Sequence, residues 1–230
     1  MYANCFKRII DFFLSLMALI VLSPLLLILT IIGTVMMQGN PFFTQLRPGL
    51  KDKSGNEKIF RLIKFRTMNN AKDENGNLLP DEQRLVSYGK FLRSTSLDEL
   101  PELFNILAGH MAVVGPRPQL VADMVFMTDE QRKRHTVRPG LTGLAQCSGR
   151  NNMSWEKKFE YDLKYIEKIT LFGDAFIILK TVGKVFARDG INEDGMATAE
   201  DLGDYLLHKG EIKKDSYDEK HLEAKAMLEV

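Results

Sequence analysis

Cysteine is scarce in this sequence, and its histidines follow no metal-binding pattern. The two cysteines, Cys5 and Cys147, cannot form the disulfide framework of a small secreted scaffold. The four histidines lack CxxC, HxxxH or HExxH spacing, so neither a structural nor a catalytic zinc site is expected. A formal net charge of +1 argues against a dedicated binder of DNA or RNA. With 45% hydrophobic and 27% charged residues over 230 positions, wholesale disorder is excluded as well.

The common nucleotide-binding fingerprints are also missing. The chain contains no GxxxxGK[ST] loop and no GxGxxG motif, which disfavours a P-loop NTPase and a Rossmann dinucleotide-binding domain. It contains no DxD triplet, which weakens the case for a metal-dependent glycosyltransferase that works by single displacement.

One long hydrophobic run lies near the N-terminus, from Ile9 to Met37, with Asp11 as its only formal charge. Such a run is long enough to cross a bilayer, which requires about 20 apolar residues. Pro24 lies near its middle and lacks an amide hydrogen, so we expect a kink there, with Ser23 donating to a freed carbonyl. Each arm would be about 21–22 Å long at about 1.5 Å per residue, too short to cross alone.

Basic residues flank this run on both sides. Lys7 and Arg8 precede it, and seven lysines and arginines follow between Arg47 and Arg66. Because positive residues tend to stay in the cytoplasm, this pattern favours a re-entrant helix–break–helix that dips into one leaflet. A single kinked transmembrane helix is the alternative. A cleaved signal peptide is disfavoured, because the run is too long and no small-residue cleavage site follows it.

The remainder is predicted to be a small α+β domain, mainly helical, with a short β-hairpin. Apolar residues in positions 58–65 predict a strand after the turn at 54–56. Positions 94–109 carry apolar residues at helical spacing, with serines and threonines before them and Gly109 after them, which predicts one amphipathic helix.

Further along, we expect a short buried strand within 111–119, a helix over 121–136 and a glycine-rich loop over 137–151. Ser154 is expected to begin the next helix, and Asp174 the one after it. The second of these has an apolar face flanked by lysines, which suits an anionic membrane surface and equally suits a core helix with snorkelling lysines. We divide the chain into a re-entrant membrane helix (1–40), a catalytic domain (41–190) and a charged C-terminal tail (191–230), with a short helix near 217–229.

The adjacent acids Asp98 and Glu99 are the candidate catalytic groups. In the first turn of the predicted helix, the helix dipole would lower their pKa values. One could then attack as a nucleophile while the other binds a divalent cation. However, Ser96 and Glu99 also match a capping box, in which the Glu99 carboxylate accepts from the Ser96 amide. Taken alone, these residues favour the capping interpretation, because such boxes are common.

Cations stand beside proline or glycine turns at four places: 47–49, 64–66, 115–118 and 138–140. A backbone of this kind lets a guanidinium meet phosphate oxygens with two hydrogen bonds. A single such turn is usually a solvated corner, but four within a hundred residues of an acidic pair suggest a phosphorylated substrate. Asp162 lies close to the apolar stripe of its helix, where burial requires a partner, and Lys158 is the expected one.

Together these motifs resemble the monotopic phosphoglycosyl transferases, the bacterial sugar transferases with a minimal catalytic domain. The resemblance runs from Phe6 to about residue 200 and includes, in order, the Ser-Pro break at 23–24, TQLRPG at 44–49, KFRTM at 64–68, SLDEL at 96–100, VGPRP at 114–118 and RPGLTG at 138–143. Within this family the chain is similar to the small enzyme of bacterial protein glycosylation that transfers phospho-bacillosamine. It differs by a longer loop near 51–57 and a longer charged tail.

This resemblance implies a re-entrant membrane helix and a catalytic role for the acid pair. It implies that Asp98 attacks the β-phosphorus of a UDP-sugar, expels UMP and forms a covalent phosphosugar ester, which a polyprenyl phosphate then displaces. Glu99 would hold Mg²⁺. The implied sugar is N-acetylated or diacetamido, and the implied location is the inner membrane, with the catalytic domain facing the cytoplasm.

The predicted substrate-binding residues are basic or polar: Arg47, Lys64, Arg66, Arg93, Arg117, Arg138 and Gln146. Asp162 and Asp174 are predicted to support them. The predicted partners are a UDP-sugar, a polyprenyl phosphate and membrane lipid, without nucleic acid. Two other functions stay open: a single-displacement glycosyltransferase that releases UDP, and a membrane-anchored scaffold without turnover.

Overall fold

The protein is a mainly helical α+β structure with two small sheets, seen in a computed structural model that describes residues 2–149, 153–187 and 200–229. The helices, with π-helix η1 and 3-10 helices η2 and η3, are η1 Tyr2–Phe6, α1 Lys7–Met36, α2 Asp81–Arg84, α3 Ser87–Thr95, η2 Leu97–Glu99, α4 Glu102–Ala108, α5 Val121–Met124, α6 Asp129–Arg132, η3 Lys133–Thr136, α7 Leu144–Ser148, α8 Trp155–Glu167, α9 Leu171–Ala187, α10 Leu202–His208 and α11 Lys214–Leu228. The strands are β1 Phe42–Lys51, β2 Glu57–Phe65, β3 Ala112–Val114 and β4 Gly140–Thr142.

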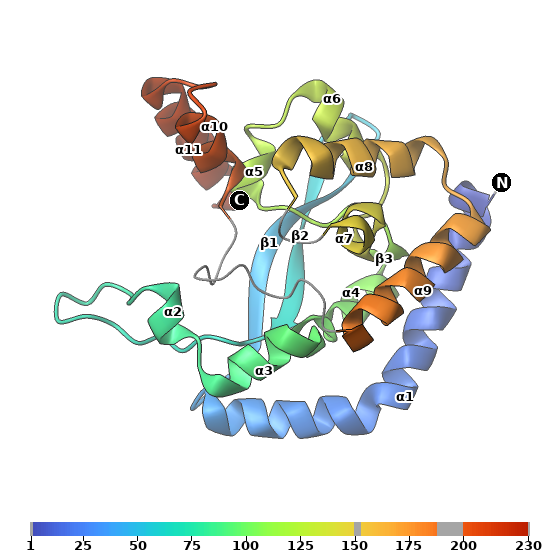
Figure 1. Cartoon of the computed structure of the whole chain (residues 1–230), viewed down its shortest axis with the longest axis horizontal. Helices are drawn as coiled ribbons and strands as arrows, with labels where there is room; N and C mark the ends of the chain where they lie inside the picture. The colour runs from blue at the N-terminus through green and yellow to red at the C-terminus, as the bar shows by residue number, and fades with distance from the viewer. Residues whose placement is uncertain (1, 150–152, 188–199, 230) are drawn as a thin grey trace.

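Helix α1 is bent between two arms, one running beside α9 and the other beneath α3 (Figure 1). Pro24 lies inside the helix and cannot donate to the carbonyl of Ile20. The Ser23 hydroxyl donates to that carbonyl instead, at 2.8 Å. The predicted kink and its compensation are therefore confirmed, and helical structure continues through the bend. Among the described residues, α1 is the one helix long and apolar enough to cross a membrane.

The N-terminal arm of α1 is fastened to the rest of the protein by buried charges. Lys7 Nζ lies 2.6 Å from Asp174 Oδ2 in α9, and the Asp11 carboxylate accepts from the backbone N–H of Val113 at 3.1 Å. The Tyr165 hydroxyl donates to Asp174 Oδ1 at 2.9 Å. We had expected Asp174 to cap this helix, but α9 begins three residues earlier, at Leu171. The Asp174 carboxylate instead accepts hydrogen bonds from Lys7 and Tyr165.

The C-terminal arm of α1 is fastened to α3. The Tyr88 hydroxyl donates to the carbonyl of Leu29 at 2.8 Å, and both side chains are buried with Phe65 of β2. A Cβ added at Gly33 would lie 3.1 Å from the Tyr88 hydroxyl, so glycine permits this close approach. Both arms of the apolar helix thus contact the same globular body.

The predicted hairpin is confirmed. β1 and β2 pair antiparallel from Phe42 opposite Phe65 to Lys51 opposite Glu57. Gly55, with φ +89°, sits in the connecting turn. On its other edge, β2 receives the side chain of Asn105 from α4, whose amide accepts from Ile63 N at 3.0 Å and donates to Arg61 O at 2.8 Å. This amide fixes α4 against the strand that carries Lys64.

The helix predicted over 94–109 is divided into three pieces. Ser96 adopts a left-handed conformation (φ +56°) and ends α3. A 3-10 turn then carries the acid pair, and α4 begins only after Pro101. Phe104, one of the apolar residues at helical spacing in this segment, is 46% exposed rather than buried. The break arises because Ser96 leaves the helical region and Pro101 has no N–H with which to continue the hydrogen-bond ladder.

The expected strand appears as β3, which pairs in parallel with β4. The segment predicted as a glycine-rich loop therefore contains a strand as well as α7. Glycines allow this pairing, because a Cβ at Gly140 would lie 2.1 Å from Gly115 N. The helix predicted over 121–136 is split into α5, α6 and η3, and Thr128 caps α6 by accepting from Gln131 N at 3.3 Å.

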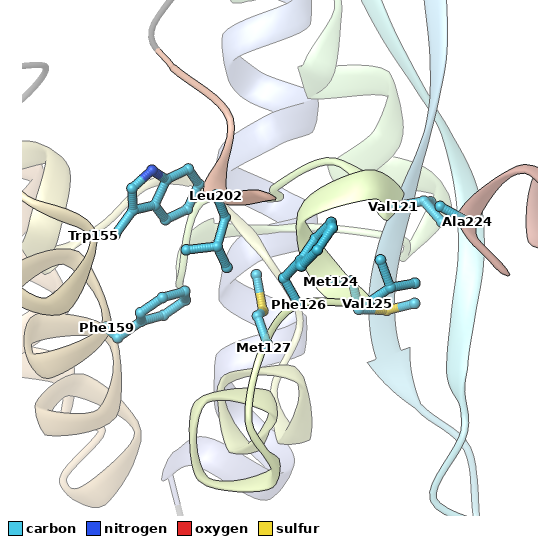
Figure 2. Close-up of a cluster of buried hydrophobic side chains, with 9 residues drawn as sticks. All are labelled: Val121, Met124, Val125, Phe126, Met127, Trp155, Phe159, Leu202 and Ala224. Carbon is cyan, nitrogen blue, oxygen red and sulfur yellow. The ribbon is translucent and has the colours of Figure 1, made fainter. Parts of the chain in front are cut away.

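The predicted start of α8 is confirmed, because Ser154 Oγ accepts from Lys157 N. The C-terminal segment contains α10 and α11, of which only the second was predicted. Both pack against α5, and Leu202, the first residue of α10, lies with Trp155 and Phe159 of α8 in the buried cluster that also includes Ala224 (Figure 2). This segment is folded onto the globular body. The domain boundary that we placed at residue 190 lies outside the described residues.

Candidate active site

The acid pair lies on the 3-10 turn η2, and both side chains line a cavity of about 1020 Å³. Lys64 of β2 and Arg117, which follows β3, line the same cavity. The fold therefore brings together groups from three segments: one from the hairpin, two from the break after α3, and one from the loop after β3.

Glu99 is clamped between two cations. Its Oε1 accepts from Lys64 Nζ at 2.8 Å and from Arg117 Nη2 at 2.7 Å. The capping interpretation is wrong, because the Ser96 amide donates to the Arg93 carbonyl at 3.2 Å and the Ser96 side chain makes no capping bond. Left-handed backbone at Ser96 removes the geometry that a capping box requires.

The two acids differ in acidity. Burial alone would raise the pKa of Glu99, but Arg117 and Lys64 lower it well below its usual range. Burial and the neighbouring Glu99 charge raise the pKa of Asp98 to about 6, against the opposing effect of Lys64 and Arg117. Our expectation that a helix dipole lowers both pKa values is therefore wrong for Asp98. At neutral pH both carboxylates are mainly ionised, and Asp98 is the more basic of the two.

Glu102 is a third acid near Lys64, one that the sequence reasoning missed, and it is buried where Asp98 and Glu99 are half-buried. Its carboxylate lies 3.1 Å from Lys64 Nζ, and its side chain is only 3% exposed. Burial raises its pKa to about 7 despite the nearby Lys64 charge. A signal was present, because Glu102 follows Glu99 by three positions in the first turn after Pro101. Lys64 thus pairs with two carboxylates, Glu99 and Glu102, and the pKa of Glu99 is lowered whereas that of Glu102 is raised.

Four further predicted substrate-binding residues line the cavity: Arg47, Arg66, Arg93 and Gln146. Arg47 donates to Gln45 Oε1 at 2.6 Å and to Pro118 O at 3.2 Å, while its buried Nε has no hydrogen-bond partner within the described chain. The buried Gln146 Oε1 is likewise unpaired there. Burial and the Arg117 charge lower the pKa of Arg47 to about 10. Two residues of the cavity wall therefore each carry a buried polar atom without a partner in the described chain, a donor on Arg47 and an acceptor on Gln146.

Arg138 is not brought to this cavity. Its Nε donates to the carbonyl of Gly109 at 2.8 Å, on the side of the protein near Arg8 of α1. The turn at 138–140 instead supplies the start of β4. Asp174 also lies outside the cavity, where it holds α1. The structure thus assigns both residues contacts within the scaffold.

Asp162 lines the cavity, and its hydrogen bonds come from Arg134, while the charge of the expected Lys158 also acts to lower its pKa. Arg134 donates to Asp162 Oδ2 from Nε at 2.9 Å and from Nη2 at 2.6 Å. The same Nη2 donates to the backbone carbonyl of Arg117 at 2.6 Å. Asp162 therefore positions Arg134, and Arg134 in turn bonds to the backbone of Arg117, which lines the cavity.

Comparison with known proteins agrees with this architecture. A family described as bacterial sugar transferase matches residues 2–188. The chain belongs to the bacterial sugar transferase family. The matched region begins in η1 and ends after α9, so it contains the apolar helix, the hairpin and the acid pair.

Relatives of this bacterial sugar transferase differ in length. It is 45% identical over 195 residues to the uncharacterized sugar transferase EpsL of Bacillus subtilis, covering 84% of this chain and 94% of that protein. It is 38% identical over 191 residues to the UDP-glucose:undecaprenyl-phosphate glucose-1-phosphate transferase of Klebsiella pneumoniae, covering 79% of this chain and 40% of that protein. It is 35% identical over 202 residues to the undecaprenyl-phosphate galactose phosphotransferase of Salmonella typhimurium, covering 80% and 41%. The chain spans about two fifths of the length of the latter two.

Proposed function

We propose that this protein transfers a sugar phosphate from a UDP-sugar to a polyprenyl phosphate and releases UMP. The proposal is carried by one observation: the half-buried Asp98 carboxylate lies beside a Glu99 held by Lys64 and Arg117, in a cavity lined with arginines. The names of the Klebsiella and Salmonella relatives, which specify undecaprenyl-phosphate sugar-phosphate transfer, support the same reaction class.

We propose that the transfer has two steps. In the first, an Asp98 carboxylate oxygen bonds to the β-phosphorus of the donor, and the bond from that phosphorus to the bridging oxygen breaks. The bonding electrons leave with UMP, and Lys64 and Arg117 neutralise the charge on the phosphoryl oxygens. In the second step, an oxygen of the polyprenyl phosphate bonds to the phosphorus, and the bond to Asp98 breaks, which regenerates the carboxylate.

We propose Mg²⁺ as the cofactor, with Glu99 as its protein ligand. The described residues contain no cluster of three or more histidine, cysteine or acidic side chains that could hold a metal alone. Mg²⁺ in phosphoryl-transfer sites is held by one or two carboxylates together with substrate phosphates, so the acid pair fits this ion. The ion would supply charge neutralisation at the diphosphate. Chelation should stop UMP release, and added Mg²⁺ should restore it.

We propose that α1 is re-entrant and that the catalytic body lies in the cytoplasm at the inner membrane. The support is that Lys7 near one end and Leu29 near the other both contact the same globular body. Many apolar side chains of α1 are exposed, such as Val21 at 68% and Val35 at 70%, which suits contact with lipid.

Cysteine labelling tests this topology. The exposed Cys5 reports on one end of α1, and Asn40→Cys in a Cys5→Ser chain reports on the other. In spheroplasts, a membrane-impermeant maleimide should label neither site until the cells are lysed. Labelling of one end only from outside would establish a spanning helix instead.

The resemblance to protein-glycosylation enzymes indicates an acetamido sugar, whereas the Klebsiella and Salmonella relatives are named for glucose and galactose. We propose a UDP-activated pyranose as the donor class. A panel of UDP-glucose, UDP-galactose, UDP-N-acetylglucosamine and a UDP-diacetamido sugar, each assayed for UMP release, identifies the donor.

The decisive experiment omits the lipid acceptor. Purified protein mixed with Mg²⁺ and donor should release UMP and gain the mass of one phosphosugar, and peptide mapping should place it on Asp98. Asp98→Asn should abolish both, while Asp215→Asn, which removes an exposed acid of α11, should retain both. Release of UDP would support a single displacement, and failure to turn over any donor would support a scaffold.

A further inference from the structure

A segment beyond the matched family region forms part of the cavity wall. The family match ends at residue 188, whereas Glu200 and Asp201 line the cavity together with Trp155 of α8. These two acids directly precede α10. The C-terminal segment therefore contributes side chains to the site that holds Asp98, so its role extends beyond covering the body.

Backbone hydrogen bonds hold this segment in place. The Leu202 amide donates to Asp123 Oδ1 at 2.9 Å, and the Glu200 carbonyl accepts from Trp155 Nε1 at 3.3 Å. The Leu202 side chain is buried among Trp155, Phe126 and neighbouring apolar residues (Figure 2). Asp201 is thus fixed from both sides by contacts that do not involve its own side chain.

The Asp201 carboxylate has no hydrogen bond or ion pair within the described chain, although the residue is partly buried. Arg47, close enough to influence its charge, presents a buried Nε without a partner. Burial and the Asp123 and Asp204 charges raise the pKa of Asp201 to about 6. An unpaired acceptor on Asp201 near an arginine that has an unpaired donor matches the hydroxyl groups of a sugar ring, each of which can donate and accept.

The positions of Lys64 and Arg47 along the hairpin agree with a sugar ring lying near Arg47 and Asp201. Lys64 pairs with Phe43 and Arg47 pairs with Phe60, so the two cations are four residues apart along the strands. This corresponds to about 13 Å at about 3.3 Å per residue. A donor held by its phosphates near Lys64 can therefore extend one of its rings toward Arg47.

We propose that Asp201 and Arg47 form a recess that binds the hydroxyl groups of a ring of the UDP-sugar donor, so that the C-terminal segment completes the donor site. This inference rests on the proposed function. Both the pyranose and the ribose of the donor carry neighbouring hydroxyls, and the experiment distinguishes them.

Donor binding tests the recess directly. The full chain carrying Asp98→Asn, which cannot consume donor, is titrated with UDP-glucose in the presence of Mg²⁺ by calorimetry. Adding Asp201→Asn should raise the Kd about tenfold, as expected for loss of a hydrogen bond to a charged acceptor. Asparagine is a good N-cap, so α10 is retained. Adding Asp215→Asn, the matched loss of an exposed acid, should leave the Kd unchanged.

The same chains are titrated with UMP. An equal loss of UMP affinity assigns the recess to the ribose, and unchanged UMP affinity assigns it to the pyranose. If adding Asp201→Asn changes the Kd for UDP-glucose by less than about twofold relative to the Asp98→Asn chain, the proposed recess is wrong but the proposed function stands. If the control chain does not bind UDP-glucose and the native chain releases no UMP from any donor, the proposed function falls with it.

Discussion

The Arg134–Asp162 pair provides a quantitative test of how the cavity is built. The side chains are only 1% and 4% exposed. We expect Asp162→Leu to lower the free energy of unfolding by about 3–5 kcal/mol, because it leaves a guanidinium buried without a counter-charge. Burial raises the pKa of Asp162, and Arg134 only partly offsets it, so the pair itself adds little net stability. Replacing both residues, as Arg134→Met with Asp162→Leu, should therefore recover most of the loss.

Stability and activity should separate in the double variant. Unfolding is followed by circular dichroism in detergent with increasing urea, and activity is followed by UMP release. The double variant should unfold near the native midpoint but keep a low turnover rate, because the Arg117 carbonyl has lost the donor that Arg134 supplied. Asp215→Asn serves as the control for removal of an acid.

Two results would refute this reasoning. A loss below about 1 kcal/mol in Asp162→Leu would show that Arg134 finds water or another partner. Full recovery of both stability and UMP release in the double variant would show that Arg134 does not position Arg117.

Two further predictions concern charge and packing. In the proposed mechanism Asp98 must be ionised to attack, and its pKa in the free protein is raised to about 6, so kcat/KM for UMP release should fall about tenfold per pH unit below that value; a flat profile from pH 5 to 8 would contradict this. Gly89→Ala should cost about 1–3 kcal/mol or more in urea unfolding, because its Cβ would lie 1.9 Å from the Thr67 carbonyl oxygen. Gly183→Ala in α9 meets no atom within 4 Å and should cost nothing, so equal stability of the two variants would show that α3 does not pack so closely.

Features that depend on neighbours in the chain could be predicted from the sequence. Pro24 bends α1, Ser23 takes up the freed carbonyl, and Ser154 caps α8, because each effect acts within one helical turn. The division at Ser96 could not be predicted, since serine rarely adopts a left-handed conformation and nothing in its neighbourhood requires it. Nor could the sequence show that Glu99 of η2 pairs with Lys64 of another segment.

The sequence predicted most of the residues that line the cavity, but only some of the contacts between them. The motifs indicated Glu99, Lys64 and Arg117, and the fold brings these three together. Lys158, four positions before Asp162, acts on it through its charge as expected, but the hydrogen bonds come from Arg134, which lies 28 positions away and was not predicted. Arg117 and Arg138 lie in similar turn motifs. The sequence therefore could not show that Arg117 lines the cavity while Arg138 donates to the carbonyl of Gly109 outside it. Local spacing identifies chemistry, but long-range packing decides which groups share a cavity.

The fastening of α1 has a consequence for how the protein is made. Lys7 is paired with a residue 167 positions later, and Asp11 with one 102 positions later. Because synthesis runs from the N-terminus, the apolar helix leaves the ribosome well before the residues that hold it exist. The helix therefore has to reach its lipid environment unsupported, and α9, made much later, closes the assembly onto it.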